Sequence, residues 1–298
     1  MRIVIGGASG MIGTELARQL AARGDEVVRL VRRPVAAAGE VPWDPASGRL
    51  DAAALAGADA VVNLSGATLS RLPWTASYRE RILASRLAAT AAITGALHEL
   101  SAAGQRVPAL VSGSAVGVYG SRPGEELTEA SAPGDGFLAE VVRRWEDAAG
   151  AAPAGARVVL ARTGLVLGPG GALRPLRVIA RLGVAGPIGG GRQHWPWISL
   201  NDEAAALVHL IGSTLSGPVN LVGPAPASSA EVVDALARAL RRPSGLPLPG
   251  WAVRAVMGEA GRELLLSDQC VRPSALLADG FVFRDSTVQD ALAALSRG

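Results

Sequence analysis

Short apolar runs alternate with amphipathic stretches over the first half of the chain. The first run, RIVIG at residues 2–6, is rich in β-branched side chains, which favour strands. Residues 10–24 (GMIGTELARQLAARG) then place apolar side chains at helical spacing and end on a glycine. EVVRLVR at residues 26–32 is a second strand-like run. This order predicts a strand, a helix and a parallel strand, which is the βαβ unit of nucleotide-binding folds.

The alternation of strand-like and helical segments continues beyond this unit. Further apolar runs are short enough to be buried parallel strands, at residues 58–66, 108–117, 156–168 and 217–223. Helical spacing of apolar side chains occurs at residues 78–100, 137–150 and 201–215. The pattern predicts an α/β fold with a Rossmann-type doubly wound, mostly parallel sheet.

The later part of the chain has a different texture. Glycine and proline become frequent after the run that ends near residue 168. A helix is predicted at residues 228–240, where Ser228 and Glu231 have the spacing of a capping box. Residues 241–250 (RRPSGLPLPG) have the composition of a linker.

These changes suggest two structural units. We expect a Rossmann domain over residues 1–165, with its sheet completed by part of residues 195–225. A smaller C-terminal α/β lobe is expected over residues 166–298, on the substrate side. The chain contains no internal repeat and no low-complexity tract apart from a general richness in alanine.

The composition is typical of a folded globular protein that has no strongly charged segment. Apolar residues make up 49% of the 298 residues, and charged residues make up 18%. The formal net charge is +3, and all 29 cationic residues are arginines. Because no dense run of basic residues occurs, we expect no nucleic-acid partner and no membrane surface. A small anionic ligand is sufficient to explain the charge.

Cysteine content, histidine spacing and hydropathy indicate the cellular compartment and whether a metal ion is bound. Cys270 is the only cysteine, so no internal disulfide can form, and the three histidines lack metal-ligand spacing. Asp59 and Asn63 interrupt the most apolar stretch. The first apolar run is cut by glycines and has no small-residue cleavage site behind it. These features predict a cytoplasmic protein with no membrane segment and no metal ion.

Glycines at residues 7, 10 and 13 follow the first predicted strand directly. Glycines at this spacing let the backbone turn tightly, bring a pyrophosphate against backbone N–H groups and pack the helix close to the strand. The pattern alone also fits a plain strand-to-helix turn, but here it lies within a βαβ unit. We therefore predict a dinucleotide-binding site.

The end of the second predicted strand indicates which dinucleotide binds. NAD-binding proteins usually have Asp or Glu there, which binds the ribose 2′-hydroxyl. This chain has Arg32 and Arg33 instead, and a guanidinium can pair with a 2′-phosphate through two parallel bonds. NADP(H) is therefore favoured over NAD(H), although both arginines also fit a solvated strand end.

Several stretches, taken together, resemble the extended short-chain dehydrogenase/reductase superfamily. The resemblance is strongest to its atypical branch called the epimerase family, or nucleoside-diphosphate-sugar epimerases. The matching stretches cover nearly the whole chain: GGASGMIG, WDP, GADAVVNLSGA, WTASYRERILASR, SGSAVGVYG, PGDGFLAEVVRRWE, RTGLVLGPGGAL, GPIGGGRQHWPWI and ELLLSDQCVRPSALLADGF. The resemblance implies a Rossmann fold with its own C-terminal domain, a nicotinamide cofactor and an activity among the oxidoreductases and isomerases.

The resemblance also implies which residues line the cofactor. They lie in the glycine loop, at the ends of predicted strands and in one helix: Gly7, Ser9, Gly10, Met11, Ile12, Gly13, Arg32, Arg33, Asn63, Leu64, Ser65, Gly66, Arg86, Ser112, Thr163, Gly164 and Val166. Arg32 would face the adenosine phosphate, and Thr163, Gly164 and Val166 would lie near the nicotinamide amide. Ser114 resembles the active-site serine of the superfamily, and Tyr119 resembles the tyrosine of its VYG motif.

The chain departs from the superfamily at the catalytic pair. There, a tyrosine followed four residues later by a lysine transfers the proton, because the lysine lowers the pKa of the phenol. Here residues 137–138 are Phe and Leu, residues 141–142 are both Val, and the chain has no lysine at all. Ser114 and Tyr119 remain as catalytic candidates, although each also fits a hydroxyl with structural contacts alone.

Other side chains have both a functional and a structural interpretation. Those that could line a substrate pocket are Trp74, Trp195, Trp197, Arg162, Arg192 and His194. An arginine inside a strand, such as Arg162, more often forms a buried ion pair, whereas His194 could act as an acid near neutral pH. Glu140 could supply a charge in the cleft, but it also fits a helical ion pair with Arg143 or Arg144.

Two functions fit these observations. The first is an NADP(H)-dependent oxidoreductase or epimerase-like enzyme that acts on a small polar substrate, such as a sugar nucleotide. The second is a non-catalytic NADP(H)-binding sensor or regulatory protein, which the missing catalytic pair favours. The superfamily analogy also suggests a homodimer.

Overall fold

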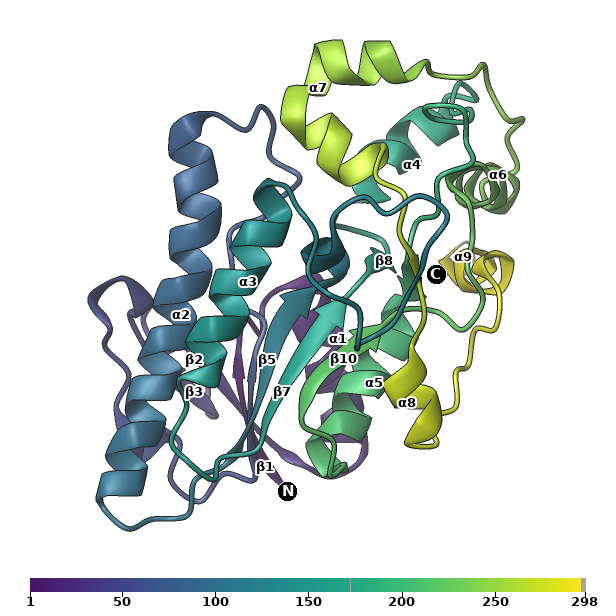
Figure 1. Ribbon diagram of the computed structural model, residues 1–298. Coiled ribbons are helices and arrows are strands. Elements are labelled where there is room, and N and C mark those ends of the chain that lie inside the picture. The colour runs from purple at the N-terminus through teal and green to yellow at the C-terminus, as the bar shows by residue number, and fades with distance from the viewer. Residues whose placement is uncertain (172, 296–298) are drawn as a thin grey trace.

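A computed structural model describes residues 1–171 and 173–295 of the chain (Figure 1). Its centre is a seven-stranded sheet formed by β1 (Arg2–Gly6), β2 (Glu26–Val31), β3 (Glu40–Pro42), β4 (Ala60–Asn63), β5 (Ala109–Ala115), β7 (Val158–Thr163) and β10 (Gly217–Leu221). Every pairing in this sheet is parallel, and the order across it is β10-β7-β5-β4-β1-β2-β3. The predicted doubly wound, mostly parallel sheet is confirmed.

The chain changes direction across the sheet at β1. Strands β2 and β3 extend from one side of β1, and the chain then returns to add β4, β5 and β7 on the other side. In doubly wound folds, ligands bind in the crevice at the carboxyl ends of the strands beside this point. The site therefore has to be built from the loops that follow β1, β2, β4, β5 and β7.

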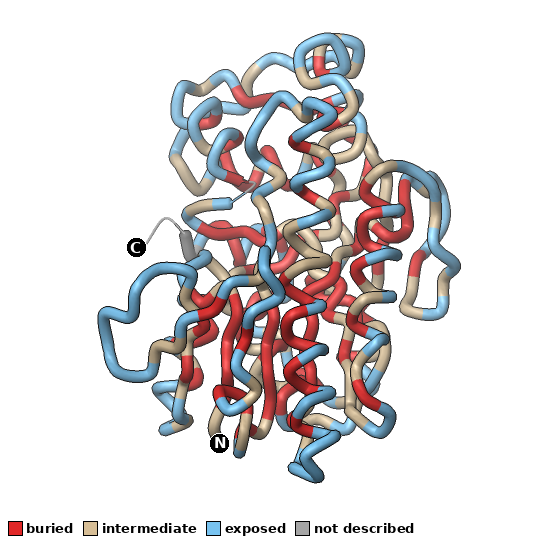
Figure 2. Tube along the Cα trace, turned by 90° about the vertical axis from the view of Figure 1, so that its left-hand side faces the viewer, coloured by how far each residue is buried: buried red, intermediate tan, exposed pale blue. Residues whose placement is uncertain are grey.

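Helices cover both faces of the sheet (Figure 1). Helices α1 (Met11–Ala22) and α5 (Leu200–Gly212) pack against each other on one face, and α2 (Ala76–Ala102) and α3 (Phe137–Gly150) do so on the other. Successive side chains of a strand point to opposite faces. Accordingly, Ile3 and Ile5 join the core under α1 and α5, while Val4 joins the core under α2. Figure 2 shows the strands as the most continuously buried part of the chain.

The apolar run at residues 156–168 forms two strands in place of one. Strand β7 ends at Thr163, and β8 (Leu165–Leu167) pairs in parallel with β9 (Trp197–Ser199) outside the central sheet. Gly164 lies between them, where an added Cβ would be 2.1 Å from the carbonyl oxygen of Pro196. Only a glycine allows this close approach, so the run turns out of the central sheet at that residue.

The later part of the chain forms a smaller lobe with its own apolar core. Its helices are α4 (Leu173–Arg181), α6 (Ser229–Ala239), α7 (Gly250–Leu265) and α9 (Val288–Leu295), with α8 (Ser274–Ala278) lying beside β10. The capping box is confirmed, because Ser228 and Glu231 exchange hydrogen bonds at the start of α6. Strand β11 (Cys270–Val271) pairs with β6 (Glu126–Leu127), which joins this segment to the larger unit.

Helix α7 lies at the top of Figure 1 and contacts the helices of the larger unit. Glu259 of α7 forms an ion pair with Arg79 of α2 over 3.1 Å. Glu263 accepts a hydrogen bond from the backbone N–H of Leu138 in the first turn of α3. Burial raises the pKa of Glu263. The smaller lobe therefore covers the ends of α2 and α3 that lie nearest to the carboxyl edge of the sheet.

Residues 1–171 and 173–295 contain neither a membrane-spanning helix nor a cluster of metal-binding side chains. None of their helices is long and apolar enough to cross a membrane. None of their His, Cys, Asp and Glu side chains gather in groups of three or more that could hold a metal ion.

Candidate functional site

The turn between β1 and α1 depends on glycines for steric reasons. Gly7 has a φ of +80°, and a Cβ on it would lie 2.7 Å from the carbonyl carbon of Leu64. A Cβ on Gly13 would lie 2.4 Å from the carbonyl oxygen of Gly7. The N–H of Gly10 closes the turn by donating to the same oxygen of Gly7 over 3.0 Å. The turn therefore packs backbone against backbone, as the glycine spacing predicts.

The start of α1 is open to an anion. Gly10 is the N-cap residue and offers no side-chain cap, and the first turn carries no acidic side chain. The N–H groups at the start of a helix lack intrahelical partners and carry partial positive charge. These amides lie at the carboxyl edge of the sheet beside the turn, so this part of the crevice fits a phosphate or pyrophosphate.

The two arginines after β2 have different surroundings. Arg33 binds Glu40 through two hydrogen bonds of 2.5 and 3.0 Å. These bonds, together with the backbone N–H of Ala36, lower the pKa of Glu40 to about 2. Arg32 is exposed and has no carboxylate partner within the described residues. Arg32 is therefore the available cation at this strand end, whereas the charge of Arg33 is already paired.

The loop after β4 is held in place by Asn63. Its Nδ2 donates to the hydroxyl of Thr90 over 3.1 Å, and its Oδ1 accepts from the N–H of Ser65 over 3.1 Å. Asn63 is fully buried, so it acts as an internal brace of the loop. The hydroxyl of Ser65 is buried without a hydrogen-bond partner in the described residues. Such an orphaned hydroxyl is the kind of group that a bound ligand satisfies.

Arg86 of α2 contacts the same loop slightly farther along the chain. Its Nη1 donates to the carbonyl oxygens of Ala67 over 3.1 Å and Ile82 over 2.9 Å. Its guanidinium carbon lies 5.1 Å from the ring centre of Trp145. Part of the side chain is exposed, but protein surrounds the guanidinium, and this burial lowers the pKa of Arg86 to about 10.

A buried network links the ends of β5, β7 and β10 to α3. Glu146 of α3 accepts two bonds from the guanidinium of Arg162, of 2.8 and 2.9 Å, and one of 2.5 Å from the hydroxyl of Ser114. Arg162 also donates to the hydroxyl of Tyr119 over 2.9 Å, and that hydroxyl donates to Asn220 over 2.7 Å. Burial by itself lowers the pKa of Arg162, but these bonds outweigh it and raise the pKa.

This network limits what its two hydroxyls can do. Tyr119 is fully buried, and burial raises the pKa of its phenol. Its hydroxyl has both a donor and an acceptor partner, and the hydroxyl of Ser114 is committed to Glu146. The geometry therefore favours a role for both residues in holding Arg162 and the strand ends in place. A catalytic role for either residue stays a prediction.

Glu203 is a buried carboxyl group that the sequence pattern does not reveal. It lies in the first turn of α5, where an acidic side chain usually faces water and favours the positive end of the helix. Here it is fully buried; its Oε1 accepts from the hydroxyl of Thr163 over 2.7 Å, and its Oε2 has no partner in the described residues. Burial raises the pKa of Glu203 to about 8.

Two aromatic side chains pack against each other at the start of α3. Trp74 and Phe137 meet edge to face with ring centres 5.6 Å apart. The guanidinium of Arg79 lies 4.4 Å from the centre of the Phe137 ring. Farther along α3, Glu140 binds Arg143 over 2.7 Å, so its charge is paired on the helix surface.

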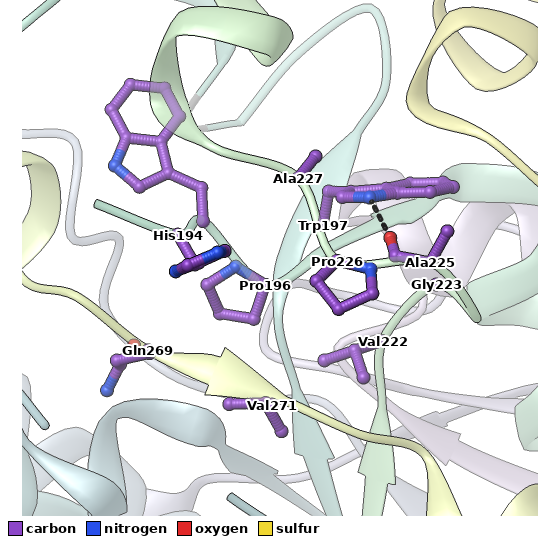
Figure 3. Close-up of a pocket in the computed structure, with 11 residues that line it drawn as sticks. His194, Pro196, Trp197, Val222, Gly223, Ala225, Pro226, Ala227, Gln269 and Val271 are labelled. Carbon is purple, nitrogen blue, oxygen red and sulfur yellow. Dashed lines mark hydrogen bonds between the residues drawn. The ribbon is translucent and has the colours of Figure 1, made fainter. Parts of the chain in front are cut away.

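A crevice too narrow to hold a water molecule lies between the exits of β10, β11 and the segment before β9 (Figure 3). Pro196, Pro226 and Val222 line its centre, and His194 and Gln269 lie at one side of it. The tryptophans of this segment are anchored in the small lobe, because the indole N–H groups of Trp195 and Trp197 donate to the carbonyl oxygens of residues 265 and 225.

His194 is oriented by Asp268. One carboxylate oxygen of Asp268 accepts from the backbone N–H of His194 over 2.8 Å and lies 2.9 Å from its Nδ1. Because Asp268 is an acceptor, Nδ1 carries the proton, and the opposite ring nitrogen, Nε2, remains without a protein partner in the described residues. Side chains that are 74 residues apart in the sequence thus form one unit.

Two protein-family models together match most of the chain. The family model described as "NAD dependent epimerase/dehydratase family" matches residues 3–223. The chain belongs to the NAD-dependent epimerase/dehydratase family. A second model, described as a domain of unknown function (DUF1731), matches residues 248–295, which contain α7, β11, α8 and α9. The resemblance to the epimerase branch with its own C-terminal domain is therefore confirmed.

Members of this family from distant organisms match nearly end to end. An epimerase family protein of Mycobacterium bovis, Mb2239, is 43% identical over 293 residues, which cover 97% of this chain and 96% of that protein. The human epimerase family protein SDR39U1 is 36% identical over 288 residues and 95% of each chain. The crystal structure of human SDR39U1 isoform 2 with NADPH has a TM-score of 0.90 and covers 100% of this chain and 99% of that one, at 34% identity.

Proposed function

We propose that this chain is an NADP(H)-dependent oxidoreductase or epimerase-like enzyme that acts on a small polar substrate. The observation that carries the proposal is the exposed Arg32, which has no carboxylate partner in the described residues and follows β2 beside the glycine turn. A guanidinium there supplies a counter-charge for a 2′-phosphate, which NADP has and NAD lacks. The solved structure of human SDR39U1 with NADPH supports this choice of cofactor.

The residues at the carboxyl edge of the central sheet fit such a cofactor. The open start of α1 and the turn at Gly7 would hold the pyrophosphate, and the orphaned hydroxyl of Ser65 would gain a partner. Thr163, Gly164 and Val166, at the exit of β7, would lie beside the nicotinamide. When bound, NADPH supplies a hydride at that ring. The smaller lobe, residues 166–298, would close the substrate side.

Proton transfer needs a side chain with a free donor or acceptor atom. The hydroxyls of Ser114 and Tyr119 keep their superfamily roles as candidates, but both are occupied by Glu146, Arg162 and Asn220. His194 instead presents Nε2 next to the crevice, while Asp268 fixes the opposite nitrogen. We propose His194 as an alternative proton donor and acceptor, because a histidine oriented by a carboxylate can serve both purposes.

A non-catalytic NADP(H)-binding sensor is the rival function. It needs the same cofactor site but no turnover, and the absence of the Tyr and Lys pair favours it. Nicotinamide absorbance of the purified protein, loaded with NADPH or NADP and exposed to fractions of a metabolite extract, separates the two functions. Oxidation or reduction in one fraction establishes an oxidoreductase. Tight cofactor binding without change in any fraction favours the sensor or a closed-cycle epimerase.

The two remaining alternatives then differ in what happens to the extract. A closed-cycle epimerase takes a hydride from its substrate onto NADP and returns the same hydride, so the cofactor shows no net change while one stereoisomer is converted into another. Chromatographic separation of isomers in each fraction, before and after incubation with the NADP-loaded protein, detects this conversion. Unchanged isomer ratios in all fractions, together with unchanged absorbance, would contradict the enzyme proposal.

A further inference from the structure

Arg86 is a partly buried cation that no carboxylate neutralises in the described residues. Its protein hydrogen bonds go from Nη1 to two carbonyl oxygens, and no carboxylate pairs with it in residues 1–171 and 173–295. Its Nε and Nη2 have no protein partner there, and neither is fully enclosed. Burying an unpaired ion costs several kcal/mol in proteins. An anionic ligand bound to Arg86 would offset this free-energy cost.

The buried Arg162 and the partly buried Arg157 show how such a charge is usually balanced. Arg162 is paired with Glu146 through two hydrogen bonds. Arg157 donates to three carbonyl oxygens at and beyond the end of α5, two of them in its last turn, where the helix carries partial negative charge. Arg86 has neither a carboxylate partner in the described residues nor a helix end beside it, because it lies inside α2; it is stabilised only by two carbonyl oxygens and the face of Trp145.

Arg86 contacts a later part of the loop after β4 than the glycine turn does. The glycine turn contacts Leu64, at the start of the loop after β4. Arg86 contacts Gly66 and Ala67, farther along the same loop, where a Cβ on Gly66 would be 3.3 Å from the guanidinium carbon. The pyrophosphate and the 2′-phosphate already have the start of α1 and Arg32 as partners in the proposed function.

We propose that Arg86 binds an oxyanion group, a carboxylate or a phosphate, of the substrate. The proposal rests on the proposed function, and it assigns the substrate to the class of anionic small molecules. Further cations lie along the same loop and helix. Arg71 and Arg81 line a hollow of about 350 Å³ next to Tyr78, and the hydroxyl of Tyr78 donates to the loop over 2.6 Å. Positive charge on this loop and helix attracts anionic ligands.

The test measures binding of oxalate and of inorganic phosphate to the NADPH-loaded protein by calorimetry. The variants are Arg86→Gln and, as a control on the exposed surface of α3, Arg144→Gln. We expect one or both anions to bind the wild type and Arg144→Gln with similar affinity and Arg86→Gln at least tenfold more weakly. NADPH should bind all three proteins within about twofold, since the cofactor phosphates have other partners.

Thermal unfolding provides a second measurement, because it distinguishes an anion-binding arginine from one with a purely structural role. Without anion, Arg86→Gln should melt at the same or a higher temperature than the wild type, because an unpaired buried charge is removed. Oxalate or phosphate should raise the melting temperature of the wild type and leave that of Arg86→Gln unchanged.

Three results would overturn the proposal. One is that neither anion binds the wild type saturably. Another is that both anions bind Arg86→Gln as tightly as the wild type. The third is that Arg86→Gln loses NADPH affinity tenfold, which would make the cofactor the source of the anion. Failure of all three proteins to bind NADPH would instead reject the proposed function.

Discussion

The hydroxyl of Thr163, at the end of β7, donates to Oε1 of Glu203 over 2.7 Å, and the other oxygen of that fully buried carboxyl group has no partner in the described residues. A carboxylate in this position would carry an unpaired negative charge inside the protein. Burial therefore raises the pKa of Glu203 from 4.5 to about 8 and keeps the group neutral at physiological pH.

The raised pKa of Glu203 predicts a loss of stability with rising pH. In the unfolded chain Glu203 releases its proton near pH 4.5, whereas the folded protein holds it to about pH 8. Between these values the unfolded state binds fewer protons, so the contribution of Glu203 to stability is complete below pH 4.5 and is lost as pH rises toward 8. The slope is at most about 1.4 kcal/mol per pH unit.

Urea unfolding of the wild type and Glu203→Gln at a series of pH values between 5 and 9 checks this prediction. The amide stays neutral, so the free energy of unfolding of the wild type should fall relative to that of Glu203→Gln as pH rises. Parallel curves for the two proteins would show that Glu203 is ionised in the folded state.

The glycine turn predicts a sharp difference between two Gly→Ala substitutions. Gly13→Ala places a methyl group 2.4 Å from the carbonyl oxygen of Gly7, so the turn has to shift and NADPH binding should be lost. Gly95→Ala is the matched control, since Gly95 lies within α2 and an added Cβ has no neighbour within 4 Å. It should leave NADPH binding unchanged and stabilise the protein by up to about 1 kcal/mol. NADPH titration and thermal unfolding of both variants provide the comparison.

Cofactor selectivity should depend on Arg32 much more than on Arg33. Arg32→Gln is expected to weaken NADPH binding about tenfold or more, because charge-assisted bonds contribute about 1.5–3 kcal/mol. NADH affinity should stay within about twofold. Arg33→Gln should have a smaller effect on NADPH, because its guanidinium is engaged by Glu40. If fluorescence titration gives equal NADPH affinities for Arg32→Gln and the wild type, the 2′-phosphate lies elsewhere.

Tyr119→Phe distinguishes a structural hydroxyl from a catalytic one. The substitution leaves Arg162 and Asn220 each without one buried hydrogen-bond partner and should cost about 1–3 kcal/mol of unfolding free energy. NADPH affinity should not change. Once a substrate is known, kcat at a temperature where the variant is fully folded should also stay within a few-fold. A thousandfold loss of kcat would show that the phenol takes part in proton transfer.

The sequence allowed the geometry of the glycine turn to be predicted. The spacing of Gly7, Gly10 and Gly13 after an apolar strand depends on local backbone sterics, and the structure shows those close approaches. Replacement of the expected acid by Arg32 can likewise be found by counting along one βαβ unit. The position of the break at Gly164 was not predicted, because the strand pairs β9, which lies far along the chain.

The sequence by itself determined the order of strands and helices, the glycine turn and the presence of cations after β2, because periodicity and backbone sterics act over a few residues. Only the tertiary structure decided which charged groups lose water and which find partners. Glu203 and Arg86 are left without counter-charges in the described residues, and His194 finds Asp268 across 74 residues. Burial and pairing depend on segments that meet only after folding, and they set the charge state of each group.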